Sequence, residues 1–163
     1  MNEKTISDKI DVKFIDGSEW EDAMALCYRT FLKFDAAVYT AEGIKNFREF
    51  VSDHSLKRMF DAGSYQVIGA YVNGELAGVV SLRDNRHISL LFVDEEHQHQ
   101  GLGRLLVRMI AEYAKDKLHE DLLTVNAAPY AVDFYHKIGF QDLGEAMTRD
   151  GITFTPMKME IKV

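Results

Sequence analysis

The chain has 163 residues, of which 47% are hydrophobic and 28% charged, and this is the composition of a globular domain with a substantial core. The formal net charge of −7 argues against a general nucleic-acid binder, because such proteins present a basic face. Every apolar run stays well short of the roughly 20 residues that a membrane span requires, and the polar N-terminus lacks the apolar region of a signal peptide.

We therefore expect one domain over residues 1–163, located in the cytoplasm, with a flexible lead over residues 1–11. The only cysteine, Cys27, excludes an internal disulfide and fits a reducing compartment. Because Cys27 lies within a helical pattern, we interpret it as a small core residue rather than a nucleophile.

The first third of the chain predicts a short strand followed by helices. The strand is expected at Val12–Ile15. Ser18 and Glu21 have the spacing of a capping box, so Ser18 is expected to begin the first helix. Apolar residues then recur at helical spacing, which predicts helices over two further segments, Thr40–Val51 and Ser55–Ala62.

The middle of the chain predicts an antiparallel meander. Tyr65–Val72 and Glu75–Arg83 have strand composition and are joined by Asn73-Gly74, the strongest short hairpin signal. Asp84-Asn85 is expected to turn the chain into a third strand, Ile88–Val93, whose apolar run indicates burial on both faces. Regular alternation predicts two opposite faces for this strand: His87, Ser89 and Leu91 on one, and Ile88, Leu90 and Phe92 on the other.

A glycine-punctuated loop connects this strand to a long amphipathic helix that begins near Leu102. The first N–H groups of a helix have no internal partner, and the helix dipole places partial positive charge there. Glycine at positions 101 and 103 lacks the Cβ that holds an anion away, and Arg104 adds a formal positive charge. The loop and the helix start therefore predict a phosphate-binding site.

Two common phosphate-binding motifs are absent. The sequence contains no Gly-Lys-Ser/Thr, and Leu106 occupies the position where a dinucleotide-binding fingerprint needs its third glycine. The segment from Gln98 to Gly103 instead resembles the Gln/Arg-x-x-Gly-x-Gly/Ala signature of the GNAT (Gcn5-related) N-acetyltransferases, which binds the pyrophosphate of acetyl-coenzyme A. The resemblance implies acetyl-coenzyme A as the cofactor, held by the strand end, the loop and the helix start: Leu91, Phe92, Val93, Gln98, His99, Gln100, Gly101, Leu102, Gly103 and Arg104.

A second segment, Thr124–Phe140, resembles the family's second motif, in which a strand ends in Asn, a helix carries Ala-x-x-Phe-Tyr, and Gly-Phe follows. The resemblance makes Tyr135 the general acid that protonates the departing sulfur. It also adds three cofactor contacts, Asn126, Phe134 and Lys137. Ala128 stands where the family often has a second Asn, so one side-chain contact to the pantetheine arm is missing.

The remaining elements complete the resemblance. Asp121–Asn126 is expected to lie parallel to the Ile88–Val93 strand, because strand–helix–strand connections cross over right-handed. A helix over Tyr130–Ile138, a strand from Phe140 and a hairpin at Asp150-Gly151 follow. This order resembles the single-domain GNAT fold, an α/β (α+β) architecture with a mixed, mostly antiparallel sheet, a splayed central parallel strand pair and flanking helices.

The acceptor side is formed in the family by the first helices, so Tyr28, Phe31 and Phe34 are expected substrate contacts. Aromatic residues at helical spacing fit a core equally well. His97 and His99 have no companion ligands at metal-binding spacing, so no metal is expected.

The general base stays open. The carboxylates of Asp94, Glu95 and Glu96 border the phosphate site, but charged loop residues are usually solvated. His87 fits either a proton relay through water or a structural role with satisfied hydrogen bonds.

The resemblance implies transfer of an acetyl group from acetyl-coenzyme A to a primary amine of a small molecule or a protein, by direct attack on the thioester. The alternative is a catalytically silent acyl-coenzyme A sensor or regulatory protein of the same fold. A nucleotide-binding α/β domain would need the motifs that fail above. The expected partner is an amine acceptor, with no nucleic acid and no membrane. The oligomeric state stays open between a single chain and a homodimer paired through an exposed last strand.

Overall fold

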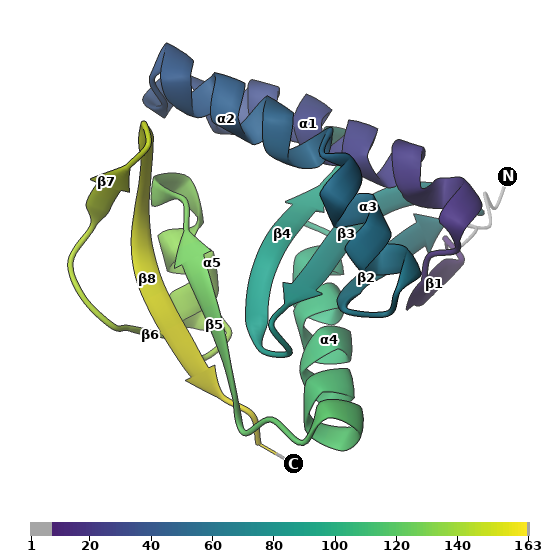
Figure 1. Ribbon diagram of the computed structural model, residues 1–163. Coiled ribbons are helices and arrows are strands. Elements are labelled where there is room, and N and C mark those ends of the chain that lie inside the picture. Colours follow the sequence, from purple (N-terminus) through teal and green to yellow (C-terminus); the bar gives the residue numbers. More distant parts are fainter. Residues whose placement is uncertain (1–7, 163) are drawn as a thin grey trace, which may run out of the picture.

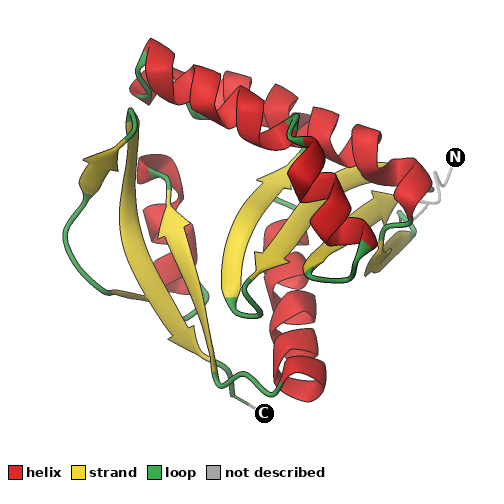
Figure 2. Cartoon of the chain, viewed as in Figure 1, coloured by secondary structure: helices red, strands yellow, loops and turns green. Residues whose placement is uncertain are grey.

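One mixed sheet runs through the computed structural model, which describes residues 8–162, and helices cover both of its faces (Figures 1 and 2). The lead predicted over residues 1–11 falls mostly outside the described residues, but Ile10 and Asp11 already belong to the first strand. The strands are β1 (Ile10–Phe14), β2 (Tyr65–Val72), β3 (Glu75–Arg83), β4 (His87–Val93), β5 (Leu122–Ala127), β6 (Gln141–Asp142), β7 (Met147–Arg149) and β8 (Ile152–Glu160). The helices are α1 (Trp20–Phe34), α2 (Ala41–Val51), α3 (His54–Asp61), α4 (Leu102–Leu118) and α5 (Val132–Lys137).

The sheet has the order β1-β2-β3-β4-β5-β8-β6, with β7 paired to β8. β1 to β4 pair antiparallel in sequence, and both turns of the meander lie where the sequence predicts them. Asn73 and Gly74 have positive φ angles of 52° and 85°, as the predicted hairpin requires. β4 and β5 form the single parallel pair among the described strands, which confirms the expected GNAT arrangement.

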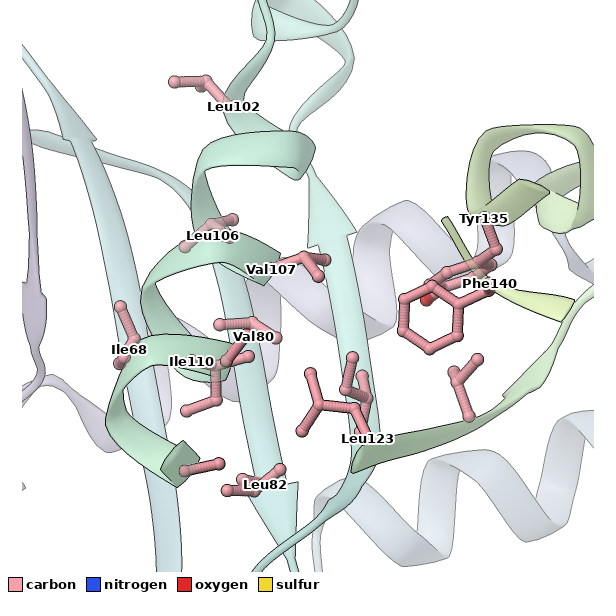
Figure 3. Packing of buried hydrophobic residues seen from close by; sticks show 14 of the residues in the cluster. Ile68, Val80, Leu82, Leu102, Leu106, Val107, Ile110, Leu123, Tyr135 and Phe140 are labelled. Atoms are coloured by element: carbon pink, nitrogen blue, oxygen red, sulfur yellow. The ribbon is translucent and has the colours of Figure 1, made fainter. Parts of the chain in front are cut away.

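Two apolar layers cover the two faces. α4 packs on one face with Leu106, Val107 and Ile110 against β2, β3 and β5, as Figure 3 shows. α1, α2 and α3 pack on the other face, where Cys27 is buried, as expected of a core residue. Burial raises the pKa of the Cys27 thiol, so it stays protonated and unreactive.

The predicted cap of the first helix is wrong. The capping side chain is that of Asp16, which accepts a hydrogen bond from the backbone N–H of Ser18 at 2.8 Å. The Glu19 side chain in turn accepts a hydrogen bond from the backbone N–H of Asp16 at 3.2 Å. This capping box begins a short 3-10 turn, Gly17–Glu19, that continues directly into α1. Asp16 and Glu19 have the same spacing as the predicted pair, Ser18 and Glu21, so spacing alone does not distinguish the two capping boxes.

A β-bulge interrupts β4 and corrects the predicted alternation. Leu90 pairs with Ser81 and Ile88 with Leu82, so Ser89 is one extra residue in β4. Ile88 therefore lies in the α4-side core, whereas Leu90 and Phe92 lie in the core under α1. Bulges bend a strand, and β4 pairs with β5 only at His87 and Ile88 before the two strands diverge (Figure 1).

The C-terminal region differs from expectation in two places. The helix predicted over Tyr130–Ile138 is a 3-10 turn at Pro129–Ala131 followed by the short α5, and Gly139 ends it with a φ of 111°. The last strand, β8, is not an exposed edge, which was the condition for pairing two copies of the chain through it. β5 flanks one side of β8, and β6 and β7 flank the other.

Candidate functional site

A cleft of about 680 Å³ opens where β4 and β5 diverge, on the face of the sheet that α1 and α2 cover. Leu91 and Phe92 line it from β4, and Asn126 lines it from the end of β5. Tyr135 of α5 and the β7–β8 hairpin complete its wall. The cleft therefore brings together residues of both predicted motifs, and beyond Ile88 the β5-facing edge of β4 has no paired strand among the described residues.

The predicted phosphate site lies beyond the end of β4, at the N-terminus of α4, and its residues do not line the cleft. Gly101 caps the helix with a φ of 80°, which favours glycine, and open space surrounds the position that its Cβ would take. Arg104 is exposed beside it, and Leu102 is buried in the core, so Leu102 can offer only its backbone N–H. This geometry fits an anion at a helix N-terminus.

Gln98 and Gly103 each make contacts within the chain. Gln98 donates its side-chain N–H to the backbone oxygen of Val93 at 3.0 Å. A Cβ on Gly103 would lie 3.2 Å from the ring of Phe134, so Gly103 lets α4 approach α5 closely. That it also clears room for an anion stays a prediction.

The acidic loop after β4 is tied to α1. Arg29 lies 3.5 Å from the Asp94 carboxylate, and Lys33 forms an ion pair with Glu95. Both pairs are solvent-exposed, so each contributes little stability, but together they align α1 with the start of the phosphate loop. These carboxylates are engaged in ion pairs and do not line the cleft.

Tyr135 is 5% exposed and lines the cleft. Its ring packs edge-on against Phe134 and Phe140, with centroids 5.2 and 5.1 Å away, and Figure 3 shows Tyr135 beside Phe140. Burial and the nearby Asp35 carboxylate raise the pKa of Tyr135. The phenol therefore keeps its proton at neutral pH and can donate it.

The structure places the three aromatic residues expected on the acceptor side in three different surroundings. Phe31 lines the cleft and stacks on Phe47 with a centroid distance of 4.0 Å. Phe34 does not line it but lies 6.4 Å from the ring of Tyr130, which does. Tyr28 lines a different groove, between α1 and the α2–α3 region, and does not reach the cleft.

Lys137 and the two loop residues His99 and Gln100 are exposed. His87 lines the cleft and shares a hydrogen bond of 2.8 Å with the Thr124 hydroxyl across the parallel pair. Burial lowers the pKa of His87, so its ring is neutral at pH 7. No group of three or more potential metal ligands occurs within residues 8–162, and no helix in that range is long and apolar enough to span a membrane.

Asp35 is a buried, charged cleft residue that sequence reasoning missed. It follows α1 directly, is 4% exposed, and lines the cleft. A lone aspartate after a helix is normally solvated, so the sequence carries no signal of this burial. Burial raises the pKa of Asp35 to about 7, although a hydrogen bond from the Tyr130 hydroxyl opposes the shift.

A contact between α2 and the β7–β8 hairpin closes one side of the cleft. Thr40 donates its backbone N–H and its hydroxyl to the backbone oxygen of Gly151, each at 3.4 Å. The Asn46 side chain donates to the backbone oxygen of Asp150 at 3.0 Å. A Cβ on Gly43 would lie 2.3 Å from the Gly151 oxygen, so this contact, the α2–hairpin clasp, requires glycine at position 43.

Curated proteins are similar to this chain in sequence. N-acetyltransferase 8F1 of Rattus norvegicus is 26% identical over 136 residues, which are 82% of this chain and 56% of the relative. N-acetyltransferase 8 of the same organism is 25% identical over 135 residues, with the same coverage of 82% and 56%. The chain thus spans about half the length of the curated relatives it matches.

Solved structures show the same architecture. A GCN5-related N-acetyltransferase from Rhodopseudomonas palustris has a TM-score of 0.79 and 18% identity, covering 98% of this chain and 99% of that chain. The PaiA N-acetyltransferase from Thermoplasma acidophilum, solved in complex with coenzyme A, has a TM-score of 0.76 and 18% identity, covering 93% and 99%. The family model described as "Acetyltransferase (GNAT) domain" matches residues 35–161, so the chain belongs to the GNAT acetyltransferase family.

Proposed function

We propose that the protein transfers an acetyl group from acetyl-coenzyme A to a primary amine of a small molecule or a protein. The single observation that carries the proposal is the cleft, in which a buried tyrosine and the unpaired edge of β4 lie together between the two GNAT motifs. The structural neighbour solved with coenzyme A supports the choice of cofactor.

Bound acetyl-coenzyme A supplies an activated acetyl group and a thiolate leaving group. The free N–H groups at the start of α4, together with Arg104, bind its pyrophosphate. The unpaired backbone of β4 around Leu91 and Phe92 hydrogen-bonds the pantetheine arm. Tyr135 holds a proton that it gives to the sulfur as the carbon–sulfur bond breaks.

The test measures release of free coenzyme A thiol from acetyl-coenzyme A across polyamines, amino acids, aminoglycosides and amine-terminated peptides. We expect one acceptor class to raise release above background hydrolysis. Spermidine belongs in this panel, because one structural neighbour is a spermidine N-acetyltransferase from Vibrio cholerae with a TM-score of 0.65. Release that no acceptor increases would refute the transferase.

An acyl-coenzyme A sensor is the second candidate, because Ala128 lines the cleft where an amide side chain was expected. A sensor predicts that acetyl-coenzyme A raises the melting temperature while no acceptor releases thiol. Loss of even that stabilisation would refute the phosphate site at α4 and both candidates with it.

A further inference from the structure

Asp35 carries a buried carboxylate whose bonding is incomplete. Asp35 lines the cleft, and its buried Oδ1 atom has no hydrogen-bond partner in the described part of the chain. No ion pair within residues 8–162 involves Asp35. The Tyr130 hydroxyl is the one side-chain donor that lowers its pKa. A buried carboxylate with one acceptor atom unused is costly and is normally paired.

The position of Asp35 in the fold adds to this cost. It is the C-cap of the 15-residue helix α1, where the helix dipole already places partial negative charge. A carboxylate there is unfavourable by itself, whereas a cation beside it is favoured by both the carboxylate and the dipole. The electrostatics of this end of the cleft therefore suit a positively charged group with an N–H to donate.

Aromatic rings surround the same point. Phe31 and Tyr39 have ring centroids 5.1 Å apart, and both line the cleft beside Asp35. Tyr39, Tyr130 and Tyr135 line the same cleft as Asp35, and the Asp35 charge raises the pKa values of all three phenols. Ring faces attract ammonium groups and pack against methylene chains.

We propose that Asp35 binds the ammonium group of the acceptor and takes the proton that this nitrogen loses before it attacks the thioester. The acceptor is then a primary alkylamine that is cationic in water and enters with an unbranched stem. This inference rests on the proposed acetyl transfer for its chemistry, but the cation site itself stands on the cleft geometry. It supplies the general base that the sequence leaves open.

The proton and electron balance closes with groups on the chain. The ammonium gives one proton to Asp35, and the freed lone pair forms the carbon–nitrogen bond. The carbon–sulfur bond breaks, Tyr135 gives its proton to the sulfur, and the second proton of the attacking nitrogen returns to the Tyr135 oxygen. Asp35 then releases its proton to water. With a pKa of about 7, Asp35 is suited to accept and release a proton at neutral pH.

Other charged groups line the cleft and define the background for this titration. The cleft groups whose pKa values respond to the Asp35 charge are the phenols of Tyr39, Tyr130 and Tyr135, which stay neutral. Glu42, Asp150, Arg83, Arg149 and His87 line the cleft elsewhere. None of these causes the shift of Asp35, which comes from burial and from Tyr130.

The test follows the Asp35 carboxyl by carbon-13 NMR in the full chain labelled at aspartate and saturated with coenzyme A. The resonance is assigned by its loss in Asp35→Asn. We expect saturating n-butylammonium chloride to lower the apparent pKa of Asp35 by at least one unit, and 1-butanol to leave it unchanged at matched ionic strength. Asp35→Asn should weaken n-butylammonium binding at least tenfold in calorimetry while coenzyme A still raises the melting temperature.

Asp116→Asn is the matched control, because it makes the same substitution at an exposed position on α4. It should bind n-butylammonium like the original protein. An unchanged pKa of Asp35 in n-butylammonium, or equal binding by Asp35→Asn, overturns the proposal. The thiol-release assay distinguishes failure of the cation site from failure of the proposed transferase. If n-butylammonium binding depends on Asp35 but no acceptor causes thiol release, the cation site is supported and the acetyltransferase activity is refuted.

Discussion

The α2–hairpin clasp gives a sharp test through Gly43→Ala. Helix propensity alone favours the change by at most about 1 kcal/mol. The new Cβ, however, would lie 2.3 Å from the Gly151 oxygen and 2.8 Å from its carbonyl carbon, and both are backbone atoms that a side-chain rotation cannot move. The hairpin must swing away, which breaks the bonds from Thr40 and Asn46 at about 0.5–1.5 kcal/mol each.

We therefore expect Gly43→Ala to lower the free energy of unfolding by about 2 kcal/mol, or the melting temperature by about 4–8 °C. Urea unfolding measures the first quantity and calorimetry the second. Because the hairpin forms part of the cleft wall, the KM for the acceptor should rise while the affinity for coenzyme A stays unchanged. Gly17→Ala is the control, because no atom lies within 4 Å of its Cβ position. A Gly43→Ala variant as stable as Gly17→Ala would refute the clasp.

Three further substitutions test the site. Tyr135→Phe keeps the ring packing and should lower kcat about 10²–10⁴-fold with cofactor affinity intact; equal turnover in a steady-state assay removes Tyr135 from the chemistry. Gly101→Ala places a side chain at φ 80°, and calorimetric titration should show weaker coenzyme A binding together with about 1–2 kcal/mol lower stability. Asp35→Asn removes a carboxyl whose pKa burial raises from 3.8 to about 7, so the original protein loses stability as pH rises through this window. The variant should therefore be more stable at pH 8, by at most about 4 kcal/mol, and equally stable below pH 4. Urea unfolding measures both values, and a stability difference that does not grow between them contradicts the raised pKa of Asp35.

Local patterns predicted most of the fold, because they report on structure within a few residues. The hairpin at Asn73-Gly74 needs two positive φ angles, which these residue types adopt readily, and the structure has both. The strand bounds Tyr65–Val72 and Glu75–Arg83 agree with the structure residue for residue. The parallel placement of β5 followed from the handedness of crossover connections, and it is confirmed.

Features that depend on contacts between distant residues could not be predicted from local sequence patterns. Alternation in β4 holds until Ser89, where the bulge moves Ile88 to the other core, and no residue type marks a bulge. The clasp brings together Gly43 and Gly151, which are 108 positions apart, so the residues around either glycine do not indicate this contact. Asp35 is buried by residues from distant parts of the chain, Tyr130 among them, and only the folded chain shows this. The roles of Tyr135 and the cofactor contacts stay predictions.

The two-residue pairing of β4 with β5 bears on whether two substrates can be bound at the same time. The strands meet at His87 and Ile88, and the α2–hairpin clasp joins the two halves of the molecule again. The proposed phosphate site lies at the N-terminus of α4, which packs on one face of the sheet, and the cleft with Asp35 opens on the face of α1 and α2. Two ligands approaching from opposite faces do not obstruct each other. For the proposed acetyltransferase we therefore expect a ternary-complex scheme in steady-state kinetics, with intersecting double-reciprocal lines and no acetylated enzyme between two half-reactions.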